Sequence, residues 1–217
     1  MTATRSALPL FLSVAARYPA VIGAVLPSSS RLARRLASVV PSAGDPVVVE
    51  LGAGTGSVTH WIRRRLAGRG RHIAVELNSE LAEFLRRAHP GLEVVHGDAA
   101  DLGQILADRG LQRVDAVVGG LPWALIGPEG QKRILSQAAR ALCAHGAFTT
   151  FAYLHALPLG GARRFRALLE STFDEVLPTR VVWRNIPPAI TYVCRRPLHG
   201  QENGAPCSER RGRPSAD

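Results

Sequence analysis

The chain has 217 residues, of which 46% are hydrophobic and 20% are charged, as in ordinary globular proteins. This length allows one domain with a substantial core, and no apolar run approaches the ~18 residues that a membrane-spanning helix needs. The formal net charge is +10 and Lys132 is the only lysine, so a largely arginine-based positive surface favours phosphate-bearing partners, either nucleic acid or lipid.

The first 45 residues precede the first convincing strand and are expected to be helical. Residues 8–18 predict a short helix that is apolar nearly all round. Serines before Arg31 can cap a second helix over residues 31–40. Its apolar residues fall opposite a basic face made of Arg31, Arg34 and Arg35. This amphipathic helix either packs on its own domain or contacts an anionic lipid surface.

From residue 46 the sequence alternates between predicted strands and helices. Strands are predicted over residues 47–51, 72–76, 92–96, 114–119, 147–153, 175–183 and 190–195, and helices over 57–67, 80–88, 102–109, 129–142 and 162–172. Such alternation is typical of a mostly parallel sheet with helices on both faces. We therefore expect a Rossmann-like α/β domain with seven strands over residues 46–196 and a disordered tail over 197–217. The N-terminal segment over 1–45 is expected to attach the protein to an anionic membrane and to help cover the active site.

A glycine-rich turn follows the first predicted strand. Glu50 precedes Gly52, Gly54 and Gly56, and a helix is predicted to begin directly afterwards. Glycines let the backbone turn tightly and approach a ligand without a side chain in the way. The turn alone is weak evidence, because a purely structural turn can carry the same residues. An NAD-binding fold is the competing interpretation, but it usually has the spacing G-x-G-x-x-G, whereas this turn has G-x-G-x-G.

Polar or glycine positions also end the next three predicted strands. Glu76 ends the second, 20 residues after Gly56, where a carboxylate can accept hydrogen bonds from both ribose hydroxyls. Asp98 follows the third, where an acid could hold an adenine amino group. Open α/β sheets bind ligands at the carboxyl ends of their strands. The predicted cofactor-binding residues are therefore Glu50, Gly52, Gly54, Gly56, Glu76, Asp98, Ala99, Gly119, Gly120 and Leu121.

This constellation resembles the class I methyltransferases, which implies S-adenosylmethionine as the cofactor. Three stretches resemble bacterial phospholipid N-methyltransferases: VIGAVLPSSS over residues 21–30, GLPW over residues 120–123, and RNIPPA over residues 184–189. The resemblance covers roughly residues 19–195. It implies methylation of phosphatidylethanolamine on its amine, toward phosphatidylcholine. The implied enzyme is a cytoplasmic monomer that associates peripherally with an anionic membrane.

That family is related to the ribosomal RNA adenine dimethylases, so an RNA substrate is the serious alternative. Those enzymes place Asn-Leu-Pro and an aromatic residue at the fourth strand, where the Asn carbonyl accepts a hydrogen bond from the target amino group. Gly120 occupies the Asn position here. The chain is also short, and we expect it to be without the helical C-terminal RNA-binding domain of those enzymes. Both departures favour a lipid amine, and a small-molecule substrate remains a third hypothesis.

Methyl transfer from a sulfonium is an in-line displacement, so the enzyme mainly aligns the nucleophile with the methyl carbon. The amine must lose a proton to a general base, or to carbonyl acceptors and water. Tyr18, Tyr153 and His155 are candidates for this role, and Trp123 could hold a methylated ammonium by a cation–π contact. Each could equally be structural. No cluster suggests a metal site. A basic group could bind a lipid phosphate or form a solvated face: Arg163, Arg164 and Arg166.

Overall fold

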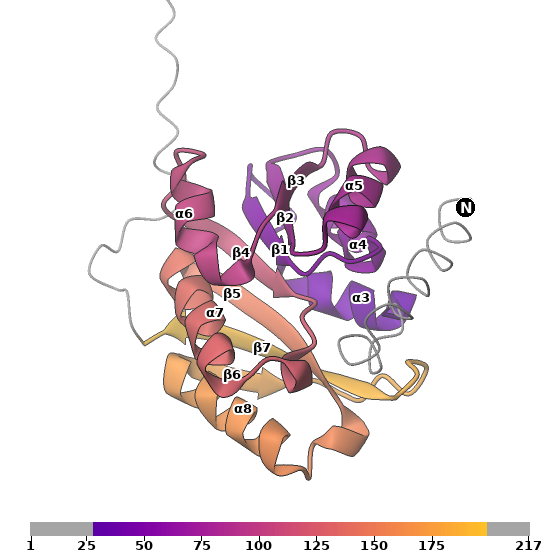
Figure 1. Cartoon of the computed structure of the whole chain (residues 1–217), viewed down its shortest axis with the longest axis vertical. Helices are drawn as coiled ribbons and strands as arrows, with labels where there is room; N and C mark the ends of the chain where they lie inside the picture. Colours follow the sequence, from indigo (N-terminus) through magenta and orange to yellow (C-terminus); the bar gives the residue numbers. More distant parts are fainter. Residues whose placement is uncertain (1–27, 199–217) are drawn as a thin grey trace, which may run out of the picture.

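The computed structural model of the chain describes residues 28–198 and is built around one twisted sheet (Figure 1). The helix expected over residues 8–18, and Tyr18 within it, lie outside the described residues, as does most of the expected tail. No helix of the described part is both long enough and apolar enough to cross a bilayer.

The sheet has seven strands in the order β3-β2-β1-β4-β5-β7-β6. The first five strands are parallel, whereas β7 runs antiparallel to both β5 and β6. This confirms the expected Rossmann-like, mostly parallel architecture. The strands are β1 (Val47–Leu51), β2 (Arg71–Glu76), β3 (Glu93–His96), β4 (Val114–Gly119), β5 (Leu142–Tyr153), β6 (Phe173–Pro178) and β7 (Ala189–Pro197).

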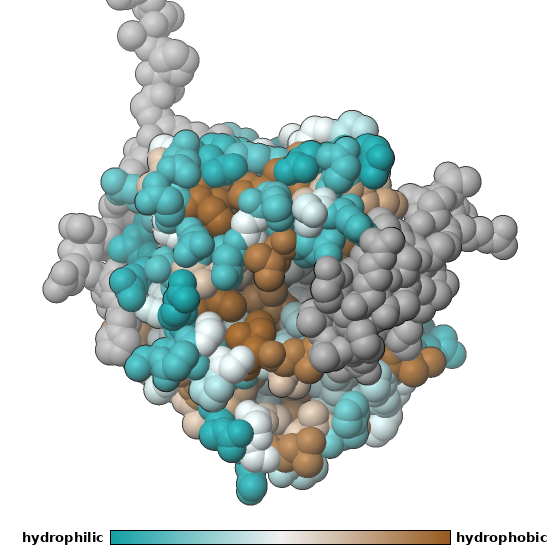
Figure 2. All heavy atoms as spheres, in the orientation of Figure 1, coloured by the Kyte–Doolittle hydropathy of each residue, from teal (hydrophilic) through white to brown (hydrophobic). Residues whose placement is uncertain are grey.

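Helices cover both faces of the sheet. One face carries α3 (Ser30–Leu36), η1 (Ala37–Val39), α4 (Ser57–Leu66) and α5 (Ser79–Ala88), and the other carries α6 (Leu102–Ala107), α7 (Pro128–Ala141) and α8 (Gly160–Thr172). Three short 3₁₀ turns follow strands: η2 (Ala99–Asp101), η3 (Trp123–Leu125) and η4 (Leu154–Ala156). Figure 2 shows mostly hydrophilic residues over the helices at the upper left and hydrophobic residues gathered in the middle of this face.

The end of β6 differs from the sequence-based expectation. The strand stops at Pro178 instead of continuing to Trp183, because proline has no N–H to donate to a neighbouring strand. Beyond it, Val182 and Ala189 form only an isolated antiparallel bridge. Residues 179–188 therefore form a connecting loop between β6 and β7.

Helix α3 packs on its own domain, which was the first of the two interpretations of its amphipathic pattern. Ser29 caps it as expected, since its Oγ accepts a hydrogen bond from the Leu32 N–H at 3.3 Å. The apolar side chains of α3 and of the residues just after it are fully buried in one core with residues of β1 and β4: Leu32, Ala33, Leu36, Ala37 and Val40. The helix cannot insert this face into a bilayer. Of the two interpretations, insertion of this apolar face into a lipid surface is therefore wrong, because the sheet already covers the face.

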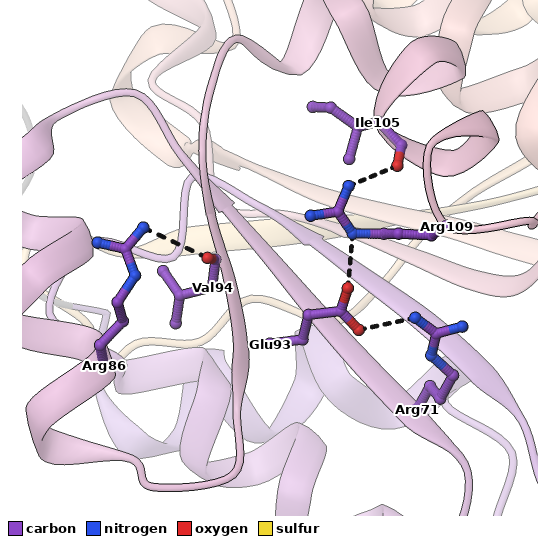
Figure 3. Close-up of polar contacts among 6 residues, drawn as sticks. All are labelled: Arg71, Arg86, Glu93, Val94, Ile105 and Arg109. Carbon is purple, nitrogen blue, oxygen red and sulfur yellow. Dashed lines mark hydrogen bonds and ion pairs between the residues drawn. The ribbon is translucent and has the colours of Figure 1, made fainter.

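Glu93 joins three elements at the amino edge of the sheet (Figure 3). One carboxylate oxygen accepts a hydrogen bond from the Arg71 guanidinium at 2.9 Å, and the other accepts one from Arg109 Nε at 2.6 Å. Arg109 also donates to the Ile105 carbonyl at 2.7 Å, at the end of α6. Partial burial opposes ionisation, but the bonds from the two arginines outweigh it and lower the pKa of Glu93.

We expect Glu93→Gln to lower the free energy of unfolding at neutral pH by less than about 1 kcal/mol, because partly exposed ion pairs contribute little. A carboxyl with a lowered folded-state pKa stabilises the protein above its unfolded pKa, about 4.3, and loses that contribution as pH falls through the folded value. Urea unfolding at several pH values should therefore show a difference that shrinks on acidification. A difference that grows would contradict this account.

Candidate cofactor site and active site

The glycine-rich turn lies between the carboxyl ends of β2 and β4. The Gly52 N–H donates to the Val75 carbonyl at 2.8 Å, and the Gly120 N–H donates to the Leu51 carbonyl at 2.8 Å. These two bonds extend the sheet pairing just beyond the strands. The structure thus brings together the ends of the first, second and fourth strands, as the sequence predicted.

All three glycines of the turn adopt left-handed backbone conformations. Their φ angles are +72° at Gly52, +56° at Gly54 and +82° at Gly56, which other residues rarely adopt. No atom lies within 4 Å of the position that a Cβ on Gly54 would occupy. The turn therefore leaves open space beside its central peptide, where a ligand can approach the backbone closely.

Gly120 is required by a close contact between two backbones. A Cβ at this position would lie 2.8 Å from the Gly52 carbonyl oxygen, which is closer than real contacts allow. An asparagine at this position would therefore force β4 away from the glycine turn. This backbone arrangement therefore leaves no room for the asparagine side chain with which the adenine dimethylases accept a hydrogen bond from their target.

Glu76 ties the end of β2 to the glycine turn. One carboxylate oxygen accepts a hydrogen bond from the Gly54 N–H at 2.8 Å, and the other accepts one from the Asn78 N–H at 2.9 Å. Asn78 in turn caps α5 through its side chain. Each oxygen of Glu76 keeps a second lone pair that can accept a bond from a ligand hydroxyl.

The buried position of Glu76 makes its ionisation sensitive to what binds there. Burial raises the pKa of Glu76, the backbone N–H groups of Asn78 and Gly54 oppose the rise, and repulsion from Glu50 adds to it. In the free protein, stability from this group is greatest at low pH and is lost as pH rises through the raised pKa. A ligand that donates hydrogen bonds to the carboxylate stabilises its charged form and so lowers the pKa of Glu76.

Glu50 is buried at the carboxyl end of β1 with half of its hydrogen-bonding capacity in use. Its Oε2 accepts a bond from the Thr59 hydroxyl at 2.7 Å and lies 3.1 Å from His72 Nε2. Its Oε1 has no hydrogen-bond partner among the described residues. A buried carboxylate oxygen without a partner is costly, so a donor group on a ligand would find a strong acceptor here.

Asp98 and Ala99 follow β3 as expected. Asp98 Oδ1 accepts a hydrogen bond from the Ala100 N–H at 2.8 Å and so caps η2. Ala99 is buried beneath this turn, whereas Asp98 is exposed and keeps its second oxygen for other donors. At the end of β4, the Leu121 side chain lies against the place where a Cβ on Gly52 would stand, 2.8 Å away.

The ring of Trp123 is buried and does not present a face to the cofactor edge for a methylated ammonium. Its ring stacks on Phe165 with centroids 4.6 Å apart, and its Nε1 donates to the Thr150 hydroxyl. Only 5% of the residue is exposed. A cation–π contact needs an accessible ring face. The catalytic contact predicted for Trp123 is therefore wrong, because its side chain packs in the core between β5 and α8.

Tyr153 ends β5 and lies against the core shared with α3. Its ring stacks on that of the exposed His155, with centroids 5.8 Å apart. Burial raises the pKa of the Tyr153 hydroxyl. Its hydroxyl therefore stays neutral near pH 7, which excludes a tyrosinate base there and leaves a group that can donate or accept one hydrogen bond.

Asn185 is a residue of this edge to which the sequence analysis gave no role. Its buried Oδ1 accepts a hydrogen bond from the Ser29 N–H at 2.9 Å, and its Nδ2 donates to the Pro187 carbonyl at 2.7 Å. This contact joins the serine stretch before α3 to the RNIPPA turn, 156 residues later. The signal in the sequence was that both stretches belong to one family pattern.

A family model described as a methyltransferase domain matches residues 48–146. An ornithine lipid N-methyltransferase from Singulisphaera acidiphila is 36% identical over 190 residues, which cover 86% of this chain and 94% of that protein. The chain belongs to the class I S-adenosylmethionine-dependent methyltransferases.

A further relative matches part of the chain, and two solved structures share its fold. The ribosomal RNA small subunit methyltransferase A of Geobacter metallireducens is 36% identical over 99 residues, covering 43% of the methyltransferase and 34% of that enzyme. The O-methyltransferase from Bacillus cereus in complex with SAH shares the fold, with a TM-score of 0.61, 20% identity, and coverage of 88% and 91%. A TehB-like methyltransferase from Corynebacterium glutamicum gives a TM-score of 0.58 at 14% identity, with coverage of 87% and 98%.

The residues at the carboxyl edge fit S-adenosylmethionine. The open space at Gly54 admits a ligand against the backbone, the unpartnered oxygen of Glu50 suits a donor such as an ammonium group, and the Glu76 carboxylate suits a ribose diol. In the described part of the chain, no group of three or more acidic, histidine or cysteine side chains could hold a metal ion.

We expect Glu76→Gln to weaken binding of S-adenosylhomocysteine at least about tenfold, because a hydrogen bond to a charged group contributes about 1.5–3 kcal/mol. Wild-type affinity should fall on acidification, starting above pH 4.5, the ordinary value of a glutamate, because protonated Glu76 is a poorer acceptor.

Titration calorimetry over a pH series measures both effects. Glu93→Gln is the matched control, since it changes the same residue type at the opposite edge of the sheet and should leave affinity unchanged. Equal affinity of wild type and Glu76→Gln would show that the ribose is held elsewhere.

Proposed function

We propose that the methyltransferase transfers methyl groups from S-adenosylmethionine to a primary amine on a membrane lipid headgroup. The proposal rests on a comparison of two relatives, a lipid enzyme and an RNA enzyme, that are equally identical to this chain but match it over very different shares of their own length. The match to the ornithine lipid N-methyltransferase covers 94% of that protein, whereas the match to the ribosomal RNA enzyme covers 34%. The likeness to the lipid enzyme thus extends beyond the cofactor site, to parts of the chain that we propose select the substrate.

The structure supports this reading through the contact between Ser29 and Asn185. The two stretches that resemble lipid N-methyltransferases outside the cofactor motifs meet in this hydrogen bond. Pro188 extends the contact, because its carbonyl accepts a bond from the Leu154 N–H at 2.8 Å, just after Tyr153. The two stretches that carry the resemblance would thus lie together beside Tyr153, on one side of the proposed reacting centre.

Two lipid amines share the proposed chemistry. The resemblance to phospholipid N-methyltransferases implies phosphatidylethanolamine, and the relative from Singulisphaera acidiphila is named for ornithine lipid. Both carry a primary alkyl amine held at the surface of a bilayer. The proposed methyl acceptor is therefore the primary amine that both headgroups share, and assaying the two lipids separately distinguishes between them.

The cofactor supplies an electrophilic methyl group, so the chain's own residues have to position the amine and accept its proton. An alkyl amine is mostly protonated at neutral pH, and only its neutral form has the lone pair that attacks. Tyr153 is proposed to accept a hydrogen bond from the amine through its neutral hydroxyl and to orient it. Because the raised pKa of Tyr153 excludes a tyrosinate there at neutral pH, the proton leaves to water.

The methyltransferase is proposed to work at the membrane surface from the cytoplasmic side. A phospholipid keeps its acyl chains in the bilayer, so the enzyme has to approach the headgroup. The net charge of +10 favours an anionic surface. On this proposal the protein associates with the membrane peripherally, acts as a monomer and needs no nucleic acid.

Transfer of a labelled methyl group to defined acceptors tests the function. We expect label from S-adenosylmethionine to enter the lipid extract when vesicles contain phosphatidylethanolamine or ornithine lipid. Vesicles of phosphatidylcholine and phosphatidylglycerol should remain unlabelled, because they offer no primary amine. Comparing the two amine lipids separately identifies the headgroup.

Glu76→Gln should lower transfer at limiting cofactor, and Glu93→Gln should transfer at the wild-type rate. A parallel reaction with ribosomal RNA in place of vesicles decides against the main alternative. Label in RNA and none in either lipid would overturn the proposed function.

A further inference from the structure

The loop between β6 and β7 presents two large hydrophobic side chains to solvent. Trp183 is 70% exposed and Ile186 is 76% exposed, more than any other large hydrophobic residue in the part of the chain that the structure describes. Single exposed apolar residues are ordinary, but a tryptophan and an isoleucine three positions apart on one turn are a local concentration.

This exposure does not come from a loosely held loop. The Val182 N–H donates to the Ala189 carbonyl at 2.7 Å, and Val182 is buried. The buried Asn185 donates from its backbone to the Val182 carbonyl at 3.2 Å and binds Ser29 and Pro187 through its side chain. The base of the loop is thus fixed to β7 and to the start of α3, so Trp183 and Ile186 are held outward.

The surroundings of these two side chains are basic. Arg180 and Arg184 are exposed within the same loop, and neither forms an ion pair among residues 28–198. The sequence has no Asp or Glu between Val176 and Val193. In Figure 2, hydrophobic and hydrophilic residues lie side by side at the right edge, where Figure 1 draws this loop below α3.

The loop lies at the same edge of the sheet as the cofactor site. Strand β6 is antiparallel to β7, which is antiparallel to β5, so β6 and β5 end at the same edge. The first residue of β7, Ala189, pairs with Tyr153 at the end of β5. A surface that bound this loop would therefore face the end of the molecule where methyl transfer is proposed.

We propose that residues 179–188 dock the methyltransferase on an anionic bilayer, with Trp183 and Ile186 in the interfacial region and Arg180 and Arg184 against lipid phosphates. Tryptophan favours the membrane interface, and basic residues beside it add attraction to anionic headgroups. An RNA ligand would use the arginines but would leave Ile186 without a role. The inference rests on the proposed lipid substrate, because docking here delivers the headgroup to the cofactor edge.

This loop, and not α3, supplies the apolar side chains for the proposed membrane contact. Helix α3 buries its apolar face in the core, and only its exposed Arg31 and Arg34 could add charge to a membrane contact. Arg35 serves the loop itself, since its guanidinium donates to the Thr179 hydroxyl at 3.4 Å and to the Arg180 carbonyl. Arg35 of α3 thus helps to hold the start of the loop in place.

Co-sedimentation of the full chain with vesicles tests the inference. The vesicles contain phosphatidylcholine alone or with phosphatidylglycerol, so binding is measured without a substrate amine. Trp183→Ser/Ile186→Ser should bind both at least about tenfold more weakly, because it removes the two exposed apolar side chains that are proposed to become buried in the membrane interface. Arg180→Gln/Arg184→Gln should bind the anionic vesicles about thirtyfold more weakly at low salt and the neutral ones unchanged.

Two variants at the opposite edge of the sheet serve as matched controls. Leu198→Ser removes an exposed apolar side chain just after β7, and Arg86→Gln/Arg87→Gln removes two exposed arginines in the last turn of α5. Both should bind vesicles as wild type does. Binding of S-adenosylhomocysteine should be equal in all variants, which shows that they fold. Wild-type tryptophan emission should shift to shorter wavelength on vesicles, and Trp183→Ser should lose that shift.

Wild-type binding by the Trp183→Ser/Ile186→Ser variant would overturn the inference and leave the proposed function standing. A loop-dependent self-association with no vesicle binding would assign the surface to a second copy of the chain, which also overturns it, as would loop-dependent binding of RNA alone. Loop-dependent vesicle binding together with methyl transfer only to RNA would support the docking surface and overturn the proposed function.

Discussion

The close approach of β4 to the glycine turn is the constraint on which the site depends. A Cβ at position 120 would stand 2.8 Å from the Gly52 carbonyl oxygen, so this approach exists only because a side chain is absent. It lets the turn bond to β2 on one side and to β4 on the other. Glu76 can then reach the Gly54 N–H, and the open space beside Gly54 lies at the meeting point of three strands.

Charges of opposite sign are separated between the interior of the site and its rim. The carboxylates of Glu50 and Glu76 are buried at the cofactor edge of a chain whose net charge is +10. Buried carboxylates favour a positively charged cofactor, and exposed arginines on the loop after β6 favour an anionic surface. If the proposed membrane docking holds, this separation would let one edge of the sheet hold a sulfonium and face lipid phosphates without the two attractions competing.

The sequence predicted the sheet well because its central strands are short, buried apolar runs between helices. The bounds of β1 and β4 were predicted to the residue, since glycine turns mark where they end. The bounds of β6 were not, because the β-branched residues after Pro178 have strand propensity but lie in a loop.

Long-range packing accounts for what the sequence could not reveal. The pattern of α3 is the same whether its apolar face meets a sheet or a bilayer, and only tertiary structure distinguishes them. The GLPW stretch located the end of β4 but did not show that Trp123 turns into the core against Phe165. The bond between Ser29 and Asn185 spans 156 positions and leaves no periodic signal.

The central claim is that the methyltransferase acts on a lipid amine where it lies, at the surface of a bilayer. The most direct test compares methyl transfer to phosphatidylethanolamine or ornithine lipid in anionic vesicles with transfer to the corresponding water-soluble headgroup at equal amine concentration. The account predicts rapid transfer to at least one vesicle lipid and little or none to the soluble amines. Equal rates on the soluble and the vesicle-bound amine would contradict it, because a soluble substrate needs no docking surface.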